Sequence, residues 1–396
     1  MLIKNISLLL GKELEYIPST SIRISDDYIE EIGNNLRPCK NEEKFDADGL
    51  LMMPGLINSH THIGDSIAKD IGIESDIETK IHPVSGFKQK ILKTTDESHL
   101  KSFIRTSCLS MIRKGITTFI DFREGGIDGI NLLRDATMGV PIRSIILGRI
   151  EYYQDSKSVK NNITIPNSQK SDLENLSRRC HGLGISGANE FSDSALEYLS
   201  NVGDIRAIHA AETEESTRLS EKKYGKTETR RALLTKPKFL VHMTYASKKD
   251  LMLTCNKKVS IVVCPRANGS LAEGIPNVNL MLDIGCNVAI GTDNVMINSP
   301  DMFKEMDYLW KVSMGMTKKR LLPKEILKMA TSNASALLGD RIGSIQKGNI
   351  ADCILVEKHA IDLEPMHNPY ASIVQRTSEN TIRAVVFGGE IVHGKI

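Results

Sequence analysis

The middle of the chain alternates between short apolar runs and segments with helical spacing, and this alternation constrains the fold most strongly. Eight runs are rich in β-branched residues, and stretches between them, such as SHLKSFIRTSCLSMIRKG, repeat apolar residues with the spacing of a helix face. The runs cover residues 50–60, 115–124, 140–151, 183–190, 204–212, 238–246, 258–268 and 286–294. Strands that alternate with helices favour a parallel sheet, so the pattern predicts an α/β fold of the (β/α)8 TIM-barrel type.

Both ends of the chain have a different texture. LIKNISLLL and SIRISDDYIEEIG near the start, and GSIQKGNIADCILVE and IRAVVFGGEIVHGKI near the end, alternate apolar and polar residues between turn signals. Such segments are typical of short strands. The two terminal β segments are therefore expected to complete one small sheet module around the central barrel.

Composition excludes several classes of protein. The chain is 40% hydrophobic and 25% charged with a formal net charge of +2, as in a soluble globular protein, and it has no basic stripe for nucleic acid. Its seven cysteines form no CxxC pair, which argues against a disulfide framework and favours a reducing, cytoplasmic location. No apolar run approaches the length of a membrane span, and the N-terminus lacks a signal-peptide pattern. We therefore expect a small-molecule partner.

Histidines and one aspartate stand where predicted strands end, which in a barrel is where the active site forms. His60 and His62 follow the first run, and because side chains alternate along a strand they share one face. His209, His242 and Asp293 stand at the ends of the fifth, sixth and eighth runs. Imidazole and carboxylate groups are suitable ligands for Zn²⁺.

Each of these residues also has a simpler interpretation. An HxH pair alone is a weak signal, a single histidine such as His242 is usually a hydrogen-bonded structural residue, and Asp293 could cap a helix or make an Asx-turn. The joint placement of all of them at strand ends favours a metal site.

Glu212 lies three residues after His209, just past a predicted strand end. A carboxylate there could take a proton from an attacking water and deliver it to a leaving group. The alternative is that Glu212 begins the next helix, as Glu214 and Glu215 are expected to do, since acidic residues suit a helix N-terminus.

The segments PGLINSHTH, HAAE, VHMTYAS and GTDN resemble those of the amidohydrolase superfamily. More narrowly, they resemble the branch that holds cytosine deaminase, guanine deaminase, S-adenosylhomocysteine deaminase and chlorohydrolase-like enzymes. The resemblance spans nearly the whole chain. It implies a β-sandwich made of residues 1–52 and 341–396 and a catalytic barrel made of residues 53–340. Members of the family often form dimers or larger assemblies, so a homo-oligomer is compatible with it.

The resemblance also implies a hydrolytic chemistry. His60, His62, His209 and Asp293 match the ligands of one divalent ion, usually Zn²⁺ and sometimes Fe²⁺. Glu212 matches the proton shuttle, and His242 matches the residue that orients the nucleophile or steadies charge on the substrate. The implied enzyme is a deaminase in which metal-activated water attacks a C–N bond of a purine, pyrimidine, nucleoside or related heterocycle, with Asp293 also acting as base.

One departure from the family leaves the substrate open. Adenosine-type deaminases carry a substrate-facing histidine after the fourth strand, and here Gly187 stands at that position. Polar residues at other strand ends are candidate substrate contacts, and their arginines suit a carboxylate or phosphate. These candidates are Arg149, Glu190, Arg266 and Asn268.

Two alternatives remain at the level of sequence. The first is an amidohydrolase that acts on a cyclic amide or another non-aromatic C–N or C–Cl bond, with two metals. The bridging lysine that binuclear members commonly carry after the fourth strand is absent from ISGANEF, although Glu151 or Glu190 could replace it. The second is a non-catalytic relative with a structural role, which the full set of ligands disfavours.

Overall fold

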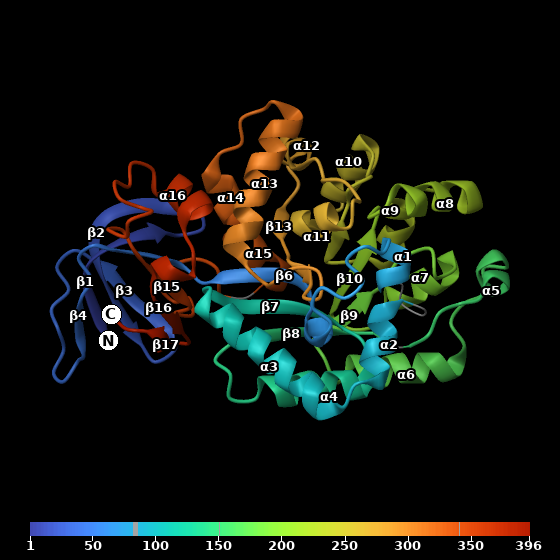
Figure 1. The fold of residues 1–396 in the computed structure, drawn as a ribbon, viewed down its shortest axis with the longest axis horizontal. Coiled ribbons are helices and arrows are strands. Elements are labelled where there is room, and N and C mark those ends of the chain that lie inside the picture. Colours follow the sequence, from blue (N-terminus) through green and yellow to red (C-terminus); the bar gives the residue numbers. More distant parts are fainter. Residues whose placement is uncertain (82–85, 150, 340) are drawn as a thin grey trace.

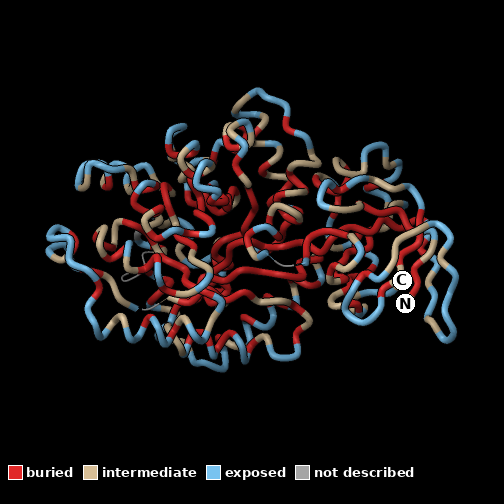
Figure 2. The backbone as a smooth tube through the Cα atoms, turned by 180° about the vertical axis from the view of Figure 1, so that it is seen from behind, coloured by how far each residue is buried: buried red, intermediate tan, exposed pale blue. Residues whose placement is uncertain are grey.

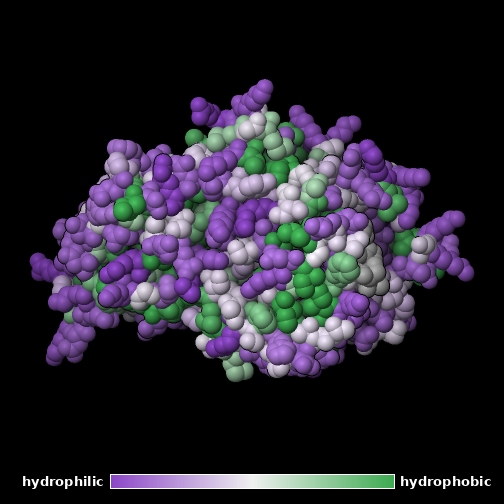
Figure 3. Space-filling model, viewed as in Figure 1, coloured by the Kyte–Doolittle hydropathy of each residue, from purple (hydrophilic) through white to green (hydrophobic). Residues whose placement is uncertain are grey.

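The computed structural model describes residues 1–81, 86–149, 151–339 and 341–396. In these residues the chain forms two sheets, and most of the helices pack around the larger one (Figure 1). The smaller sheet holds both chain termini, which lie side by side in both views (Figures 1 and 2). Hydrophilic residues predominate on the face seen in Figure 3, where hydrophobic residues form separate patches.

The larger sheet is parallel and curled, and it runs in the order β13-β12-β11-β10-β9-β8-β7-β6-β14. Its strands are β6 (Leu56–His62), β7 (Ile116–Arg123), β8 (Arg143–Gly148), β9 (Gly182–Ile185), β10 (Ile205–Ala210), β11 (Phe239–His242), β12 (Ser260–Val263), β13 (Val288–Ile290) and β14 (Asp293–Asn294). Only Gly291 and Thr292 separate β13, which pairs with β12, from β14, which pairs with β6. Each predicted run overlaps at least one of these strands, so the expected parallel strands are confirmed.

Helices follow most strands of the larger sheet and cover its outer face (Figure 1). The helices of the described residues are α1 (Ile77–Ile81), α2 (Phe87–Thr94), α3 (Glu97–Arg113), α4 (Gly126–Thr137), α5 (Ser156–Lys160), α6 (Asn167–Ser177), α7 (Asp193–Leu199), α8 (Glu214–Tyr224), α9 (Glu228–Ala232), α10 (Lys248–Asn256), α11 (Pro265–Ser270), α12 (Val278–Ile284), α13 (Met302–Thr317), α14 (Pro323–Met329), α15 (Ser332–Leu338) and, after a strand of the smaller sheet, α16 (Pro369–Arg376). Short 3₁₀ turns lie at Ile63–Ile67, Leu233–Thr235 and Glu379–Thr381.

The strands of the larger sheet are buried on both faces, as parallel strands usually are (Figure 2). Every residue of β7 is buried. Phe119 joins the core that includes the surrounding helices, whereas its neighbour Ile120 joins a second cluster with Phe239 and Val262. Successive side chains of a strand point to opposite faces, so the sheet separates two apolar layers.

The smaller sheet takes strands from both ends of the chain, in the order β17-β16-β15-β5-β1-β2-β3, with β4 beside β1. Its strands are β1 (Leu2–Leu10), β2 (Glu15–Ser25), β3 (Tyr28–Gly33), β4 (Lys44–Asp46), β5 (Leu50–Pro54), β15 (Cys353–Glu357), β16 (Ile382–Phe387) and β17 (Glu390–Gly394). The N-terminal part meets the C-terminal part where β5 pairs antiparallel with β15. The first predicted run, 50–60, is therefore two strands in two sheets, divided at Gly55.

Within the residues described, no helix combines the length and the apolar character that crossing a membrane requires.

Candidate metal centre

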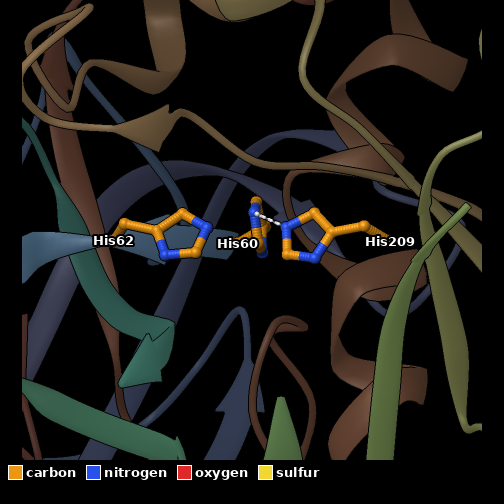
Figure 4. Close-up of side chains that lie close together, drawn as sticks. All are labelled: His60, His62 and His209. Atoms are coloured by element: carbon orange, nitrogen blue, oxygen red, sulfur yellow. Dashed lines mark hydrogen bonds between the residues drawn. The ribbon is translucent and has the colours of Figure 1, made fainter. Parts of the chain in front are cut away.

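Three imidazoles from two strands converge at one end of the larger sheet (Figure 4). His60 and His62 both lie on β6, and His209 lies on β10. Nε2 of His209 is 3.2 Å from Nε2 of His60, and one ring nitrogen from each of the three residues lies within 4.8 Å of the others. The two-residue spacing on β6 thus directs both of its imidazoles to the same point.

Asp293 brings a carboxylate to the same cluster. Its Oδ1 lies 3.3 Å from Nε2 of His60 and 3.7 Å from Nε2 of His62. Asp293 opens β14, where its left-handed φ of 60° sets the side chain beside β6. Residues held in this region of φ are strained and cluster at functional sites.

Hydrogen bonds on the far side of two imidazoles fix which nitrogen faces the cluster. Nδ1 of His209 lies 3.1 Å from the carbonyl oxygen of Ile185, and Nδ1 of His62 lies 2.8 Å from Oε1 of Glu124. A carbonyl oxygen only accepts, so Nδ1 of His209 carries the hydrogen and Nε2 presents its lone pair. Nδ1 of His60 is buried and has no hydrogen-bond partner within the described part of the chain. This set of donors fits a divalent cation.

Burial favours the neutral form of His60 and His209, which is the form that binds a cation. Burial lowers the pKa of His60 to about 4, although Asp293 opposes the shift. It also lowers the pKa of His209 well below its ordinary value, with the neighbouring histidines adding to the effect. For Asp293 burial alone would raise the pKa, but the hydrogen bond with His60 and the interactions with the adjacent histidines lower it overall, so the carboxyl group is ionised.

Glu212 and His242 lie next to this cluster. Oε1 of Glu212 is 3.5 Å from Nε2 of His242, and one potential ligand atom of each residue lies within 4.8 Å of one of Asp293. Burial raises the pKa of Glu212 to about 7, with His242 opposing and Asp293 adding to the shift. A carboxyl group that titrates near neutral pH can both accept and release a proton.

A cavity of about 600 Å³ opens beside the cluster. His62, His209 and Glu212 line it, as do two of the predicted substrate contacts, Arg149 and Glu190. Gly187 lines it too, and a Cβ there would lie 3.6 Å from Oε1 of Glu190 and 3.8 Å from Oε1 of Glu228. The stretch SGANE after β9 therefore forms part of the cavity wall.

The structure gives the other two predicted substrate contacts different partners. Nη1 of Arg266 lies 3.4 Å from Oε1 of the buried Glu305 on α13, and Arg266 is not among the described residues that line the cavity. Oδ1 of Asn268 accepts a hydrogen bond from Nδ1 of His242 at 3.0 Å, and its Nδ2 donates to Thr244. Asn268 thus orients His242, and a substrate contact for either residue stays a prediction.

Sequence reasoning assigned no role at the metal centre to three buried charged residues that lie next to the cluster. Glu124 contacts His62, Lys88 contacts Glu124, and Asp65 accepts a hydrogen bond from Asn294, the residue after Asp293. Glu124 ends the predicted run 115–124, which is the one signal that pointed to it. Lys88 and Asp65 lie between strands, in a segment without a strand-end pattern.

Comparisons with known proteins match most or all of the chain, and they agree with one another. The model of the amidohydrolase family matches residues 51–392. A protein of Methanothermobacter thermautotrophicus, whose name assigns it provisionally to the aminohydrolases, is 39% identical over 396 residues and is covered, like this chain, to 99%. The 5-methylthioadenosine/S-adenosylhomocysteine deaminase of Caldanaerobacter subterraneus is 28% identical, over 100% of this chain and 93% of its own. An adenosine deaminase structure from Xanthomonas campestris with bound zinc has the same fold, with a TM-score of 0.81 and 19% identity over 98% of this chain and 92% of its own.

Proposed function

Because the chain belongs to the amidohydrolase family, and is thus a hydrolase of carbon–nitrogen bonds other than peptide bonds, we propose that it deaminates a nitrogen heterocycle. One observation carries the proposal. Three imidazoles and the Asp293 carboxylate converge at the edge of a cavity that also contains Glu212, a carboxyl group with a pKa near neutral.

In this proposal one divalent cation, Zn²⁺ in preference to Fe²⁺, is held by His60, His62, His209 and Asp293. The donor set supports it, since neutral imidazoles and an ionised carboxylate are the ligands that zinc hydrolases use. The zinc in the Xanthomonas campestris structure supports the same ion. When bound, such a cation lowers the pKa of a coordinated water toward neutrality.

The protein's own residues would move the protons. Oε1 of Glu212 would accept a proton from the attacking water, and Glu212 would then deliver this proton to the ring nitrogen or the leaving amine of the substrate. Asp293 would assist as a base. Asn268 holds Nδ1 of His242, so Nε2 of His242 points toward Glu212 and would face charge that develops on the substrate. Hydrolysis of the C–N bond then releases ammonia.

The proposed substrate is a purine, pyrimidine, nucleoside or related heterocycle, as the name of the Caldanaerobacter relative suggests. Gly187 leaves open space where adenosine-type deaminases carry a histidine, so the substrate is expected to differ from theirs near that wall. Nothing among the described residues favours the binuclear alternative, because Glu151 and Glu190 lie outside the groups of potential ligands.

We also propose the finer fold assignments that the family implies. The curled sheet would be the (β/α)8 barrel of residues 53–340, since β13 and β14 join the two ends of its strand order. The sheet of both termini would be the β-sandwich of residues 1–52 and 341–396. All seven cysteines are free, which agrees with the cytoplasmic location that we propose.

A Glu212→Gln variant tests the mechanism, because the amide keeps the shape of the side chain but cannot carry the proton. Ammonia release should be screened over purines, pyrimidines, nucleosides, pterins and imidazole derivatives, with the metal content of each sample measured alongside. We expect Glu212→Gln to retain one ion per chain and to lose turnover.

Glu214→Gln is the matched control, since Glu214 lies two residues away on the exposed first turn of α8, and it should retain full activity. Wild-type turnover in Glu212→Gln would contradict the mechanism. Two tightly held ions per chain would contradict the single metal, and stoichiometric metal in His60→Ala would remove His60 from the ligands.

A further inference from the structure

A buried lysine, Lys88, lies next to the candidate metal centre. Nζ of Lys88, on α2, is 2.5 Å from Oε1 of Glu124, and the same oxygen is 2.8 Å from Nδ1 of His62. The three side chains form a continuous series that runs from a helix through a carboxylate to an imidazole of the cluster. Lys88 also lines the cavity, together with its neighbour Gln89.

A second branch leads from the same lysine to the other side of the cluster. Nζ of Lys88 lies 3.9 Å from Oδ2 of Asp65, which is fully buried. Oδ2 of Asp65 accepts a hydrogen bond from Nδ2 of Asn294 at 2.7 Å, and its Oδ1 accepts from the backbone N–H of Met296 at 3.0 Å. Asn294 directly follows Asp293 in β14. Lys88 thus stands between two carboxylates, each connected to a different strand of the centre.

Burying these charged groups costs hydration free energy, so stability of the fold alone does not explain the arrangement. Lys88 is 3% exposed and Glu124 is 2% exposed. Buried ion pairs lose so much hydration that apolar side chains of similar size are often as stabilising. A carboxylate that holds the far nitrogen of a metal-binding histidine does have a specific effect, because it fixes the tautomer and the ring orientation.

We propose that Glu124 and Lys88 are positioning residues, in which Glu124 holds His62 with Nε2 toward the cluster and Lys88 holds Glu124. This inference rests on the proposed function, and it adds that helix α2 controls the geometry of a metal ligand. The helix that supplies one wall of the cavity is thereby connected to His62 by two contacts.

Metal affinity in Glu124→Gln and Lys88→Met tests the inference without relying on turnover. Zinc dissociation constants should be measured by competition with a chromogenic chelator, and folding of the metal-free proteins should be checked by thermal unfolding. Loss of such an outer partner typically weakens metal binding about 10- to 100-fold. We expect that loss in both variants, and no change in Lys90→Met, an exposed lysine on the same helix.

The double variant separates positioning in series from general damage. If Lys88 acts on His62 only through Glu124, the losses of zinc affinity in the two single variants should not add up. The double variant Glu124→Gln/Lys88→Met should then bind zinc about as weakly as Glu124→Gln alone. Nitrogen-15 spectra of the histidine rings in the metal-free proteins give a second measurement. His62, assigned with a His62→Gln variant, should be protonated at Nδ1 in the wild type and should shift toward a tautomer mixture in Glu124→Gln.

Several outcomes would overturn the inference. Zinc affinity within twofold of wild type in folded Glu124→Gln would do so, as would additive losses in the double variant or an unchanged His62 ring. These failures differ from failure of the proposed function, in which the wild-type protein itself would hold no metal or release no ammonia.

Discussion

Gly291 lets two backbones pass in contact at the candidate metal centre. A Cβ at this position would lie 2.6 Å from Cβ of His60 and 2.7 Å from its backbone nitrogen. We predict that Gly291→Ala displaces His60, loses about 1–3 kcal/mol of unfolding free energy by overpacking, and weakens zinc binding. Urea denaturation and chelator competition measure the two effects.

Gly315→Ala is the matched control for that variant. Gly315 lies within α13 with nothing within 4 Å of its would-be Cβ. Alanine there should raise stability by about 0.5–1 kcal/mol, because glycine is the poorer helix former. If Gly291→Ala is as stable as the wild type, β6 can move at His60 without loss of stability, and the predicted overpacking is wrong.

Gly187 presents the opposite case, because its wall of the cavity has room. A Cβ would make ordinary contacts at 3.6 Å and 3.8 Å, so Gly187→Ala should keep its stability within about 0.5 kcal/mol. The methyl group would project into the cavity where we place the substrate, so KM should rise several-fold. Steady-state kinetics with the best substrate measures this, and an unchanged KM would place the substrate elsewhere in the cavity.

Single residues also show where sequence reasoning reaches its limit. The spacing of two between His60 and His62 and the positions of His209 and Asp293 follow from strand periodicity, and the structure brings all four together. Lys88 could not be found this way, because its contact with Glu124 depends on how α2 packs. Arg266 matched the strand-end rule, but Glu305 on α13 lies beside its guanidinium.

At the scale of elements, Asp193 at the start of α7 connects two neighbouring segments. It accepts hydrogen bonds from Lys226 and from the fully buried Arg231 of α9. Burial alone would raise the pKa of Asp193, but these two cations lower it below its ordinary value of about 3.9. The carboxylate therefore stabilises the folded state fully when the pH is above the ordinary pKa. This contribution is lost as the pH falls through the lower pKa of the folded state.

We predict that Asp193→Asn costs about 1–3 kcal/mol at neutral pH, since it leaves a buried guanidinium without its charged partner. The difference from wild type should shrink as the pH falls from about 5 to 2, where the wild-type carboxylate also becomes neutral. Urea midpoints across this range measure the effect. Asp172→Asn, at an exposed position of α6, should track wild type at every pH. A difference that stays constant with pH would exclude the charge as its cause.

Element boundaries were less predictable than element types. The run 50–60 looks like one apolar strand, yet β5 and β6 belong to different sheets. The change occurs at Gly55, where a Cβ would lie 2.3 Å from Oγ1 of Thr117. Periodicity within a buried strand carries no record of which sheet it joins, because both faces are apolar in either case.

At the scale of the whole molecule, the candidate ligands tie together strands that are far apart in sequence, namely β6, β10 and β14. A cation that binds only the folded chain stabilises it by about 4 kcal/mol at a thousandfold excess over its dissociation constant. We predict that Tm falls when metal is removed by a chelator and rises again with added zinc. Differential scanning calorimetry over a range of zinc concentrations measures this. His60→Ala should respond far less, and a Tm independent of zinc in the wild type would contradict the site.

The overall plan was predictable in outline only. Apolar runs that alternate with helical segments predicted the parallel sheet with its helices. Alternating apolar and polar residues at both ends of the chain predicted strands, which meet in one sheet. The place of each terminal strand was not predictable, because β1 lies between β5 and β2 through pairings that the local sequence does not encode.

The pairing of β5 with β15 has a consequence for how the protein is made. Leu51 of β5 pairs with Val356 of β15, so this pair can form only after Val356 has left the ribosome. At about 5–20 residues per second, the chain between them takes some tens of seconds to synthesise. Throughout that time the apolar edge of β5 lacks its neighbour, and unpaired strand edges attract other chains. Nascent chains halted before residue 353 should therefore need a chaperone to stay unaggregated.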